Sequence, residues 1–337
     1  MKLNVKSLSV LLVVQLLLAL GIFYGKQLTT TSNSADLIVN QASGEIKEIS
    51  ITDDLDSSVQ LLFRDNEWLI TNENDFPADS DKISNFLESI NSLSSQSVSA
   101  VAVTEGARNR FKVADNEFSK RIKLTSVANT SEELYLGSSP GLDRVHIRKG
   151  GEDGIFVVKF PTYEASSSSS SWLDKSILQV PSSDIVYIKT GDIILERKSE
   201  SGTDTSEEKI EKTISELNLM EGLGSWQATK SDDQSRPLNQ EAAREITKQI
   251  ERLRFTNLSD IDQYNKLNSE EVLVLILQLQ DETEIKYILN KHESNYYLRT
   301  SDWDRVFSIG SYTAERLLES VSKEVLFPAE ALAPNEE

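Results

Sequence analysis

The sequence predicts an α+β protein of two duplicated domains, each an antiparallel sheet with one long helix on a face, after an N-terminal transmembrane anchor. Three observations carry this prediction: an apolar segment near the N-terminus, short runs of alternating apolar and polar residues between turn residues, and the same order of features in both halves of the chain. Alternation with a period of two is typical of strands, and a repeated order of elements is typical of duplication.

The first 26 residues have the pattern of a membrane anchor. Lys2 and Lys6 precede an apolar stretch at 8–24, and Lys26 closes it. As a helix the stretch would be roughly 25 Å long, the short end of what crosses a bilayer. The alternative is a cleaved signal peptide with its site at Ala19-Leu20-Gly21, although the apolar run continues past that site. Lysines before the stretch favour a cytoplasmic N-terminus, with the rest of the chain outside the inner membrane.

Three segments are predicted to lack regular secondary structure. Residues 27–44 are mostly small and polar and indicate a flexible tether, with a first strand at the apolar patch Leu37-Ile38-Val39 as the alternative. The serine run at 165–172 indicates a flexible loop. The tail at 329–337 indicates disorder.

The first domain is expected at 45–180. Ile49 and Ile51 alternate in an opening strand, and a hairpin follows whose second strand carries Trp68. Asp79 is placed to cap a helix whose apolar residues recur at helical spacing. Four short alternating runs follow between residues 121 and 160, as in an antiparallel meander.

The second domain is expected at 181–328 because the same features return in the same order. The pairs Pro77 and Pro237, Asp79 and Asn239, and Leu93 and Leu253 are separated by the same number of residues. The other matching pairs are Trp68 with Trp226, Phe111 with Tyr264, Leu136 with Ile288, His146 with Tyr297, and Arg148 with Arg299. Both tryptophans are expected in the core between helix and sheet, and His146 is expected to be a strand residue.

The second copy carries an insertion with its own helical pattern at 206–221, where Ile210, Ile214 and Leu217 share one face. The second copy also has Leu273, Leu275 and Leu277 in place of the polar residues Arg121, Lys123 and Thr125 of the first. Leucines left in water would forgo roughly 1.5–3 kcal/mol each. We expect the inserted helix to cover them; otherwise the three leucines are the candidate partner or interdomain surface.

The composition excludes several kinds of chemistry. Lys and Arg total 35 against 54 Asp and Glu, a net charge of −19, which argues against nucleic acid as a partner. The absence of cysteine excludes disulfides, thiolate catalysis and cysteine-ligated zinc. Two histidines and the lack of a phosphate-binding glycine loop, a nucleophile elbow or a zinc-protease motif leave no reaction to assign. We expect no enzyme activity, no cofactor and no metal.

A set of short motifs follows the same order as in a known family. They are Ile49-Ser50-Ile51, Glu67-Trp68-Leu69-Ile70, Pro77-Ala78-Asp79, Leu134-Tyr135-Leu136-Gly137 and Val145-His146-Ile147-Arg148, with Tyr297-Leu298-Arg299 in the second copy. This order resembles the bacterial family called domain of unknown function 4340. The second copy departs from it at Pro237-Leu238-Asn239 and at Ile288-Leu289-Asn290, which lacks the glycine.

The resemblance implies a membrane-anchored envelope protein, since members of that family are often associated with transporter components of the gliding-motility, ATP-binding-cassette type. It implies no catalytic residues. We therefore expect a single-pass protein of the bacterial inner membrane with most of its chain in the periplasm. Its expected role is a non-catalytic accessory or scaffold with protein partners, among them transporter subunits. The alternative is a periplasmic binding module for a glycan or lipid of the envelope.

Overall fold

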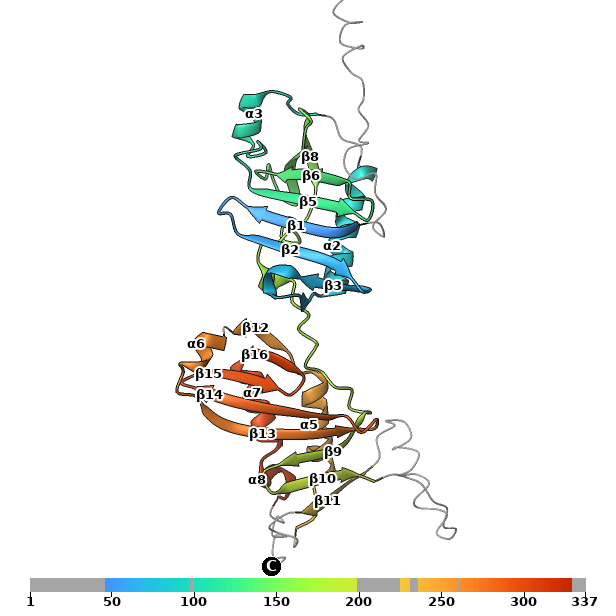
Figure 1. The fold of residues 1–337 in the computed structure, drawn as a ribbon, viewed down its shortest axis with the longest axis vertical. Helices are drawn as coiled ribbons and strands as arrows, with labels where there is room; N and C mark the ends of the chain where they lie inside the picture. Colours follow the sequence, from blue (N-terminus) through green and yellow to red (C-terminus); the bar gives the residue numbers. More distant parts are fainter. Residues whose placement is uncertain (1–45, 97–99, 199–224, 231–235, 260, 329–337) are drawn as a thin grey trace, which may run out of the picture. The chain divides into compact units, whose positions relative to one another are not determined.

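A computed structural model describes residues 46–96, 100–198, 225–230, 236–259 and 261–328 of the chain (Figure 1). The predicted anchor at 1–26, the tether at 27–44, the inserted helix at 206–221 and the tail at 329–337 lie outside these residues. Within them, no helix combines the length and the apolar character needed to cross a bilayer.

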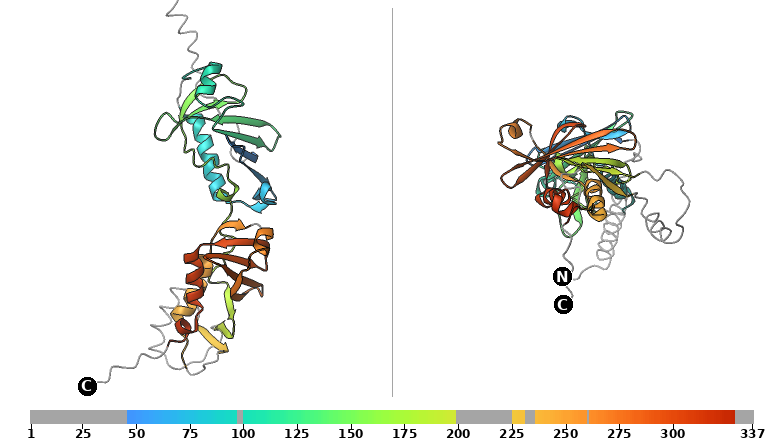
Figure 2. Two further views of the ribbon diagram at one scale, coloured as in Figure 1. Left: turned by 90° about the vertical axis from the view of Figure 1, so that its left-hand side faces the viewer. Right: turned by 90° about the horizontal axis from the view of Figure 1, so that it is seen from below.

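Two antiparallel sheets of eight strands each form the core of the chain, which confirms the predicted α+β class. The chain divides into two compact units between Leu173 and Asp174, slightly before the predicted join at 180/181, and each unit holds one sheet. In each unit the longest helices lie on one face of the sheet (Figure 2). We call these unit 1 and unit 2.

The strands of unit 1 lie side by side in the order β4-β3-β2-β1-β5-β6-β7-β8. Neighbours in this sheet are antiparallel throughout, as expected for a meander joined by short turns. Their bounds are β1 (Ile46–Asp53), β2 (Ser58–Arg64), β3 (Glu67–Ile70), β4 (Phe76–Pro77), β5 (Lys120–Ser126), β6 (Ser131–Leu136), β7 (Arg144–Lys149) and β8 (Ile155–Lys159).

The strands of unit 2 lie in the order β11-β10-β9-β13-β14-β15-β16-β12, so seven of the eight strands, from β11 to β16, repeat the order from β3 to β8 in unit 1. The additional strand is β4 at one edge of unit 1 and β12 at the opposite edge of unit 2. The bounds are β9 (Ile185–Thr190), β10 (Ile193–Arg197), β11 (Trp226–Lys230), β12 (Phe255–Ser259), β13 (Glu270–Leu279), β14 (Glu284–His292), β15 (Asn295–Thr300) and β16 (Trp303–Ile309).

Helix α2 (Ser80–Ser92) is the long helix of unit 1 and begins where the sequence predicts. The side chain of Asp79 accepts a hydrogen bond from the backbone N–H of Lys82 at 3.0 Å, which caps the helix. Its buried residues recur every three or four positions, so one face packs on the sheet. The shorter helices of this unit are η2 (Thr71–Glu73), η3 (Leu93–Ser95), α3 (Glu105–Arg110) and η4 (Ser169–Ser171).

The serine run of unit 1 is fastened to the fold, which corrects the expected flexible loop. The indole Nε1 of Trp172 donates to the carbonyl of Ser166 at 2.8 Å, and the ring is fully buried. The hydroxyl of Ser167 donates to Asp53 Oδ2 at 2.7 Å. This hydrogen bond is the largest cause of the lowered pKa of Asp53. The Trp172 ring also packs against Phe86 of helix α2, with centroids 5.6 Å apart, so the run is held against that helix.

Helix α5 (Gln240–Glu251) is the counterpart of α2 in unit 2, and the Asn239 side chain caps it as predicted. A second helix, α7 (Ser311–Ser320), packs beside α5, followed by α8 (Lys323–Leu326). Unit 2 thus has more helix on this face than the one long helix predicted. Helix α6 (Ile261–Asn265) is short.

The pairing registers show the duplication residue by residue. In each unit one isoleucine of the central strand pairs with a leucine on either side. These ladders are Leu61–Ile49–Leu124 in unit 1 and Leu195–Ile188–Leu277 in unit 2. They assign β1 to β9, β2 to β10 and β5 to β13. Every other equivalence below is counted from these ladders.

The tryptophans occupy the same place in the two units, as predicted. Trp68 stands opposite Phe63 and is 8 % exposed, whereas Trp226 stands opposite Arg197 and is 2 % exposed. Phe63 and Arg197 each lie two residues beyond the leucine of their own ladder. Both tryptophans therefore belong to the core between helix and sheet.

The registers also correct the face assigned to Leu273, Leu275 and Leu277. Leu277 occupies the position of Leu124, so Leu275 occupies that of Ile122, a residue already facing the core. The sequence comparison was wrong by one residue, which exchanges the two faces of a strand. The three leucines are 8, 0 and 0 % exposed.

The opposite face of β13 carries Val272, Val274 and Ile276, each half-buried. An unusual apolar face is therefore present, but valines and isoleucine form it. The part of the hypothesis that gives the leucines to a partner or to the first domain stays a prediction, and their burial gives it no support. The proposed cover by 206–221 falls outside the described residues.

Candidate functional site

Each sheet has a second face, the one turned away from α2 or α5. On β7 this face carries His146 and Arg148, and on β15 it carries Tyr297 and Arg299, because their alternate neighbours point to the core. The second face is toward the reader in Figure 1.

The predicted equivalence of Arg148 and Arg299 is confirmed by the registers. Arg148 stands opposite Tyr135 on β6, and Arg299 stands opposite Ile288 on β14. Tyr135 and Ile288 occupy equivalent positions in their own sheets, so the predicted match of Leu136 with Ile288 is wrong by one residue. An arginine therefore stands at the same sheet position in both units, but the surroundings of the two arginines differ.

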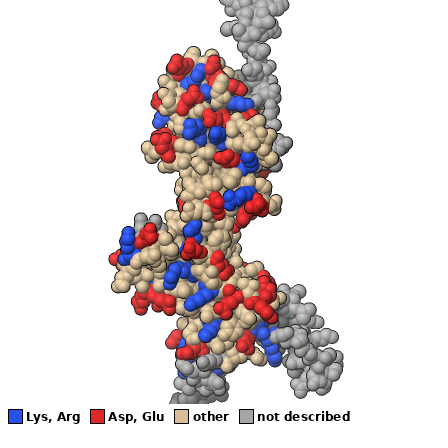
Figure 3. All heavy atoms as spheres, viewed as in Figure 1, with Lys and Arg blue, Asp and Glu red and all other residues tan. Residues whose placement is uncertain are grey.

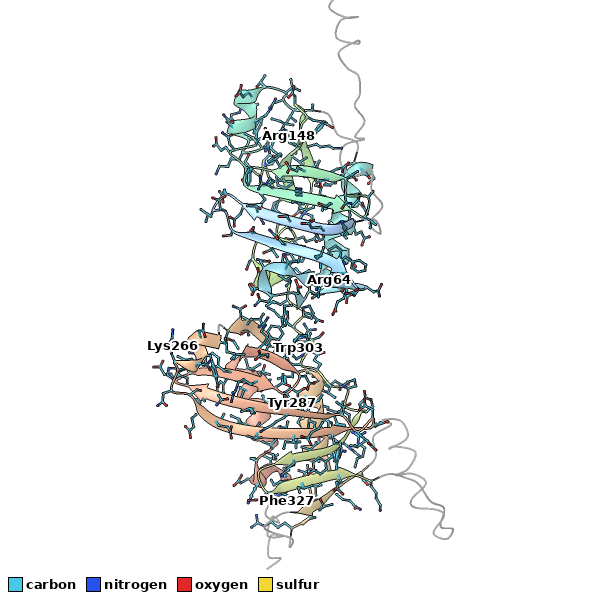
Figure 4. All side chains as sticks on the ribbon, viewed as in Figure 1. Arg64, Arg148, Lys266, Tyr287, Trp303 and Phe327 are labelled. Carbon is cyan, nitrogen blue, oxygen red and sulfur yellow. The ribbon has the colours of Figure 1, made fainter. Side chains whose placement is uncertain are left out.

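In unit 1, Arg148 is enclosed by its own chain and is 1 % exposed (Figure 4). Its Nε donates to the carbonyl of Val113 at 2.6 Å, and its Nη1 donates to the carbonyl of Glu152 at 3.0 Å. Its Nη2 donates to Asp115 Oδ1 at 2.6 Å. The guanidinium carbon also lies 4.5 Å from the centre of the Tyr135 ring. A buried guanidinium needs such a complete set of acceptors.

Two pKa shifts record this enclosure. The hydrogen bond from Arg148 lowers the pKa of Asp115 below its ordinary value of 3.8. Burial raises the pKa of Tyr135 to about 12, with the nearby Glu133 carboxylate adding to the effect. At neutral pH Asp115 is therefore charged and Tyr135 is neutral, which suits a structural role rather than an acid–base role.

Glycine at position 137 lets the covering segment approach β6. A Cβ atom there would lie 1.9 Å from the carbonyl oxygen of Phe111 and 2.7 Å from the Val113 side chain. The same carbonyl accepts the backbone N–H of Ser138 at 2.8 Å. The Phe111 ring stacks on His146 with centroids 4.1 Å apart. Gly137 therefore allows residues 111–115 to close over Arg148.

Unit 2 changes two of these residues. Asn290 occupies the position of Gly137, counted from the paired strands. Asn268 aligns with Asp115 by sequence count alone, because the register of β13 shifts between Glu271 and Leu273. Tyr264 still faces Tyr297, but their rings are tilted and 5.5 Å apart. With a side chain at 290 and no carboxylate at 268, the cover of unit 1 is not reproduced. Arg299 is exposed.

A hollow of about 250 Å³ opens beside Arg299 on the second face of unit 2. We call it the arginine hollow. It lies between α6 and strands β14 to β16, and its lining combines basic, aromatic, hydroxyl and apolar side chains. These residues are Ile261, Tyr264, Asn265, Lys286, Ile288, Arg299, Thr300, Ser301, Trp303, Asp304, Arg305 and Val306.

Three cations and one carboxylate line this hollow, in a chain whose net charge is −19. Figure 3 shows Lys and Arg side chains gathered over the sheet of unit 2. In the described part of the chain no ion pair reaches Lys286, Arg299 or Arg305. The guanidinium of Arg299 lies 5.7 Å from the centre of the Tyr264 ring.

Thr300 follows Arg299 and therefore points to the opposite, core side of β15, where its Oγ1 is buried without a hydrogen-bond partner among the described residues. Trp303 lines the same hollow and is marked in Figure 4. The guanidinium and ammonium groups that line this hollow suit a carboxylate or phosphate oxygen, which accepts several hydrogen bonds at once.

Sequence comparison paired the two arginines but did not identify this site. The usable signals were the loss of the glycine at Asn290, which the motif comparison noted, and the loss of the acid at Asn268, which it did not. His146 is a strand residue as predicted, with Nδ1 within 2.7 Å of the carbonyl of Ser138. Within the described residues, no group of three histidine, aspartate or glutamate side chains is arranged to hold a metal ion.

The family model described as "Domain of unknown function (DUF4340)" matches residues 68–270. The match covers more than half of the chain, so the chain belongs to this family, as its motifs suggested. No curated protein and no solved structure matches the chain.

Proposed function

We propose that this member of the family is a non-catalytic accessory or scaffold protein, held at the inner membrane by residues 1–26 with its two units in the periplasm. Its partners would be proteins of an envelope complex, among them subunits of an ABC-type transporter. Unit 2 would bind an acidic group of such a partner in the arginine hollow.

One observation carries the proposal. In unit 1 the arginine of β7 is bound by a carboxylate of its own chain, and in unit 2 the same arginine is exposed with asparagine in place of that acid. In unit 1 a carboxylate is therefore bound to the guanidinium, and unit 2 lacks that carboxylate. An acidic side chain from another protein would complete it.

The hollow also favours a local rather than a general attraction. A chain with a net charge of −19 repels acidic peptides on average, so binding of such a peptide would depend on the few cations that line the hollow. Asp304 in the lining would favour a ligand that places its charge close to Arg299.

The alternative function is a binding module for an envelope glycan or lipid. The same cations would accept the phosphate of a lipid headgroup, and the small volume of about 250 Å³ suits a headgroup as well as one side chain. The experiment therefore needs probes that distinguish an acidic peptide from an anionic lipid.

The test measures binding of a labelled tetra-glutamate peptide to the full chain in detergent, by fluorescence anisotropy, against a tetra-glutamine peptide. We expect only the glutamate peptide to bind, and Arg299→Gln to weaken its binding by about tenfold. Asn268→Asp should weaken it too, because the new carboxylate occupies the guanidinium. Arg144→Gln is the matched control, since Arg144 is an exposed arginine of β7.

Equal weakening by Arg144→Gln and Arg299→Gln would show that the attraction arises from general charge. That result would contradict the proposal. Displacement of the peptide by vesicles of anionic lipid, but not by vesicles of neutral lipid, would favour the alternative function instead.

A further inference from the structure

The second face of unit 2 carries a group of apolar residues beside the arginine hollow. It consists of Val272, Val274 and Ile276 on β13 and Ile288 on β14, all half-buried, and we call it the apolar stripe. Val274 stands opposite Ile288, and Ile288 stands opposite Arg299. Opposite residues have Cβ atoms about 5 Å apart, so the stripe begins within about 10 Å of Arg299. Because Ile288 also lines the arginine hollow, the stripe and the hollow are continuous.

Unit 1 has polar residues at the positions of the stripe. Counted from the ladders, Arg121 occupies the position of Val274. Lys123 occupies the position of Ile276 and stands opposite Glu133 of β6. Unit 1 therefore places cations on this face, one of them opposite an acid, and the apolar stripe belongs to unit 2 alone.

Cations border the apolar stripe. Lys189 on β9 and Lys286 on β14 stand on either side of Ile276, and both lysines are exposed. Arg299 stands at the end of the row that starts at Val274. In the described part of the chain no ion pair reaches any of these three cations. Such a surface is complementary to a partner that carries apolar side chains next to carboxylates.

The end of the stripe away from Arg299 is polar and acidic. Beyond Ile276 the next residue of β13 on this face is Gln278, which stands opposite Glu284. The same row reaches Glu196 on β10, and both glutamates are exposed. A carboxylate of the partner is therefore favoured beside Arg299 and disfavoured at this end, which gives the partner a direction.

The partner has to bind through side chains. The backbone of β13 is paired with β9 on one side and with β14 on the other, so no further strand can pair with it. On the opposite face of this sheet helices form the covering layer, as Figure 2 shows. From Val272 to Ile276 the stripe is about 14 Å long, which is the length of about nine residues of helix. A helix of a few turns therefore fits the stripe.

We propose that the apolar stripe and the arginine hollow together bind one acidic amphipathic helix of a partner protein. The apolar side chains of that helix contact Val274, Ile276 and Ile288. A carboxylate at one end of its apolar face binds Arg299. The acidic contact rests on the proposed function, whereas the apolar contact rests on the stripe.

Two labelled peptides of about 18 residues test the proposal, with fluorescence anisotropy measured on the full chain in detergent. One peptide has leucine at helical spacing and glutamate and alanine elsewhere, and the other has the same composition in scrambled order. Empty micelles of the same detergent give the background. We expect the helical peptide to bind about tenfold more tightly than the scrambled one.

The Val274→Thr/Ile276→Thr variant should weaken binding of the helical peptide about tenfold. Threonine suits a strand and keeps the charge, but it removes apolar surface. The same variant should bind the tetra-glutamate peptide as the natural chain does, because Arg299 is unchanged. Val127→Thr is the matched control, since Val127 is a 65 % exposed valine of unit 1.

A second variant, Val274→Arg/Ile276→Lys, introduces the residues that unit 1 carries at the same register. It should lose the preference for the helical over the scrambled peptide and bind the tetra-glutamate peptide more tightly. Failure of the tetra-glutamate peptide to bind the natural chain, with stripe-dependent binding of the helical peptide retained, would contradict the proposed function and leave the apolar contact supported.

Equal binding of the helical and scrambled peptides to the natural chain would overturn the proposal, as would equal weakening by Val127→Thr and the double threonine variant. Tighter binding of the helical peptide by a variant that lacks residues 206–221 would show that the chain covers its own stripe, and would also overturn it. So would dimers of the natural chain that the double threonine variant abolishes, because a second copy would then occupy the stripe.

Discussion

The second faces of the two units differ in whether the chain supplies a carboxylate to its own arginine. Unit 1 buries Arg148 beneath residues 111–115 and gives it a carboxylate, whereas unit 2 leaves Arg299 exposed beside a hollow. Both arginines stand at the same place in the same strand order. Two sequence differences accompany it, since Asn290 stands at the position of Gly137 and Asn268 aligns with Asp115.

Burial explains why the two outcomes are distinct. A guanidinium taken out of water destabilises the fold unless its donors find acceptors, and in unit 1 three backbone carbonyls and one carboxylate provide them. In unit 2 the guanidinium remains in contact with water, which satisfies its donors without the chain. A ligand can therefore replace the water molecules around Arg299.

Removing the arginine should affect the two units very differently. Arg148→Met leaves the carbonyls of Val113 and Glu152 without their donor, and we expect unit 1 to lose about 2–4 kcal/mol of unfolding free energy. Arg299→Met should change unit 2 by about 0.5 kcal/mol or less, as for other exposed positions. Hydrogen exchange with mass spectrometry, read separately on β7 and β15, checks both. Equal losses in the two units would break the comparison.

Exchanging the glycine should open the cover of unit 1. Gly137→Asn gives unit 1 the residue of unit 2, and its Cβ would collide with the Phe111 carbonyl. We expect a loss of about 1–3 kcal/mol, as for other crowded sites. Faster exchange of the Ser138 amide, which donates to that carbonyl, is the direct measurement. The reciprocal Asn290→Gly in unit 2 is the control, and protection of Ser138 equal to that of the natural chain would contradict the role of the glycine.

Acid should weaken unit 1 through Asp115, with no such effect through Asn268. The pKa of Asp115 is lowered in the folded chain, so its stabilising effect is present above the ordinary value of 3.8 and is lost as the pH falls below it. In Asp115→Asn this part of the pH dependence should disappear. Urea unfolding of both chains above and below pH 3.8, followed by exchange at β7, measures the difference. Parallel pH profiles would show that the ion pair contributes nothing.

The smallest expected effect is the addition of the missing acid to unit 2. Asn268→Asp should stabilise unit 2 by at most about 1 kcal/mol, because the new pair with Arg299 remains in water. Added salt should remove the gain. The midpoint of urea unfolding at low and at high salt measures it. A gain that persists at high salt would indicate that the segment closes as in unit 1, and would sharpen the comparison toward Asn268 alone.

Much of the fold was predictable because it is encoded locally. Asp79 and Asn239 both cap their helices, and the spacing of Ile83, Phe86 and Ile90 placed the buried face of α2. The duplication was visible as ordered pairs such as Trp68 with Trp226. Helix α7 was not predicted because the turn between β16 and Ser311 carries only a glycine signal, with no side-chain cap.

The candidate site was less predictable because its parts are distant in sequence. Arg148 meets Val113 and Asp115 more than 30 residues away, and no local period reports such a meeting. The face of Leu275 also depended on pairing with β9, where a shift of one residue exchanges the core and the second face.

The sequence by itself determined the repeated order of strands, the capped helices, the family and the excess of acidic charge, since each is a property of neighbouring residues or of composition. Only the tertiary structure decided that the three leucines point inward, that Gly137 admits a covering segment, and that Arg299 stays open. The physical reason is that these outcomes depend on which side chains, far apart in the chain, compete for the same space and the same hydrogen bonds.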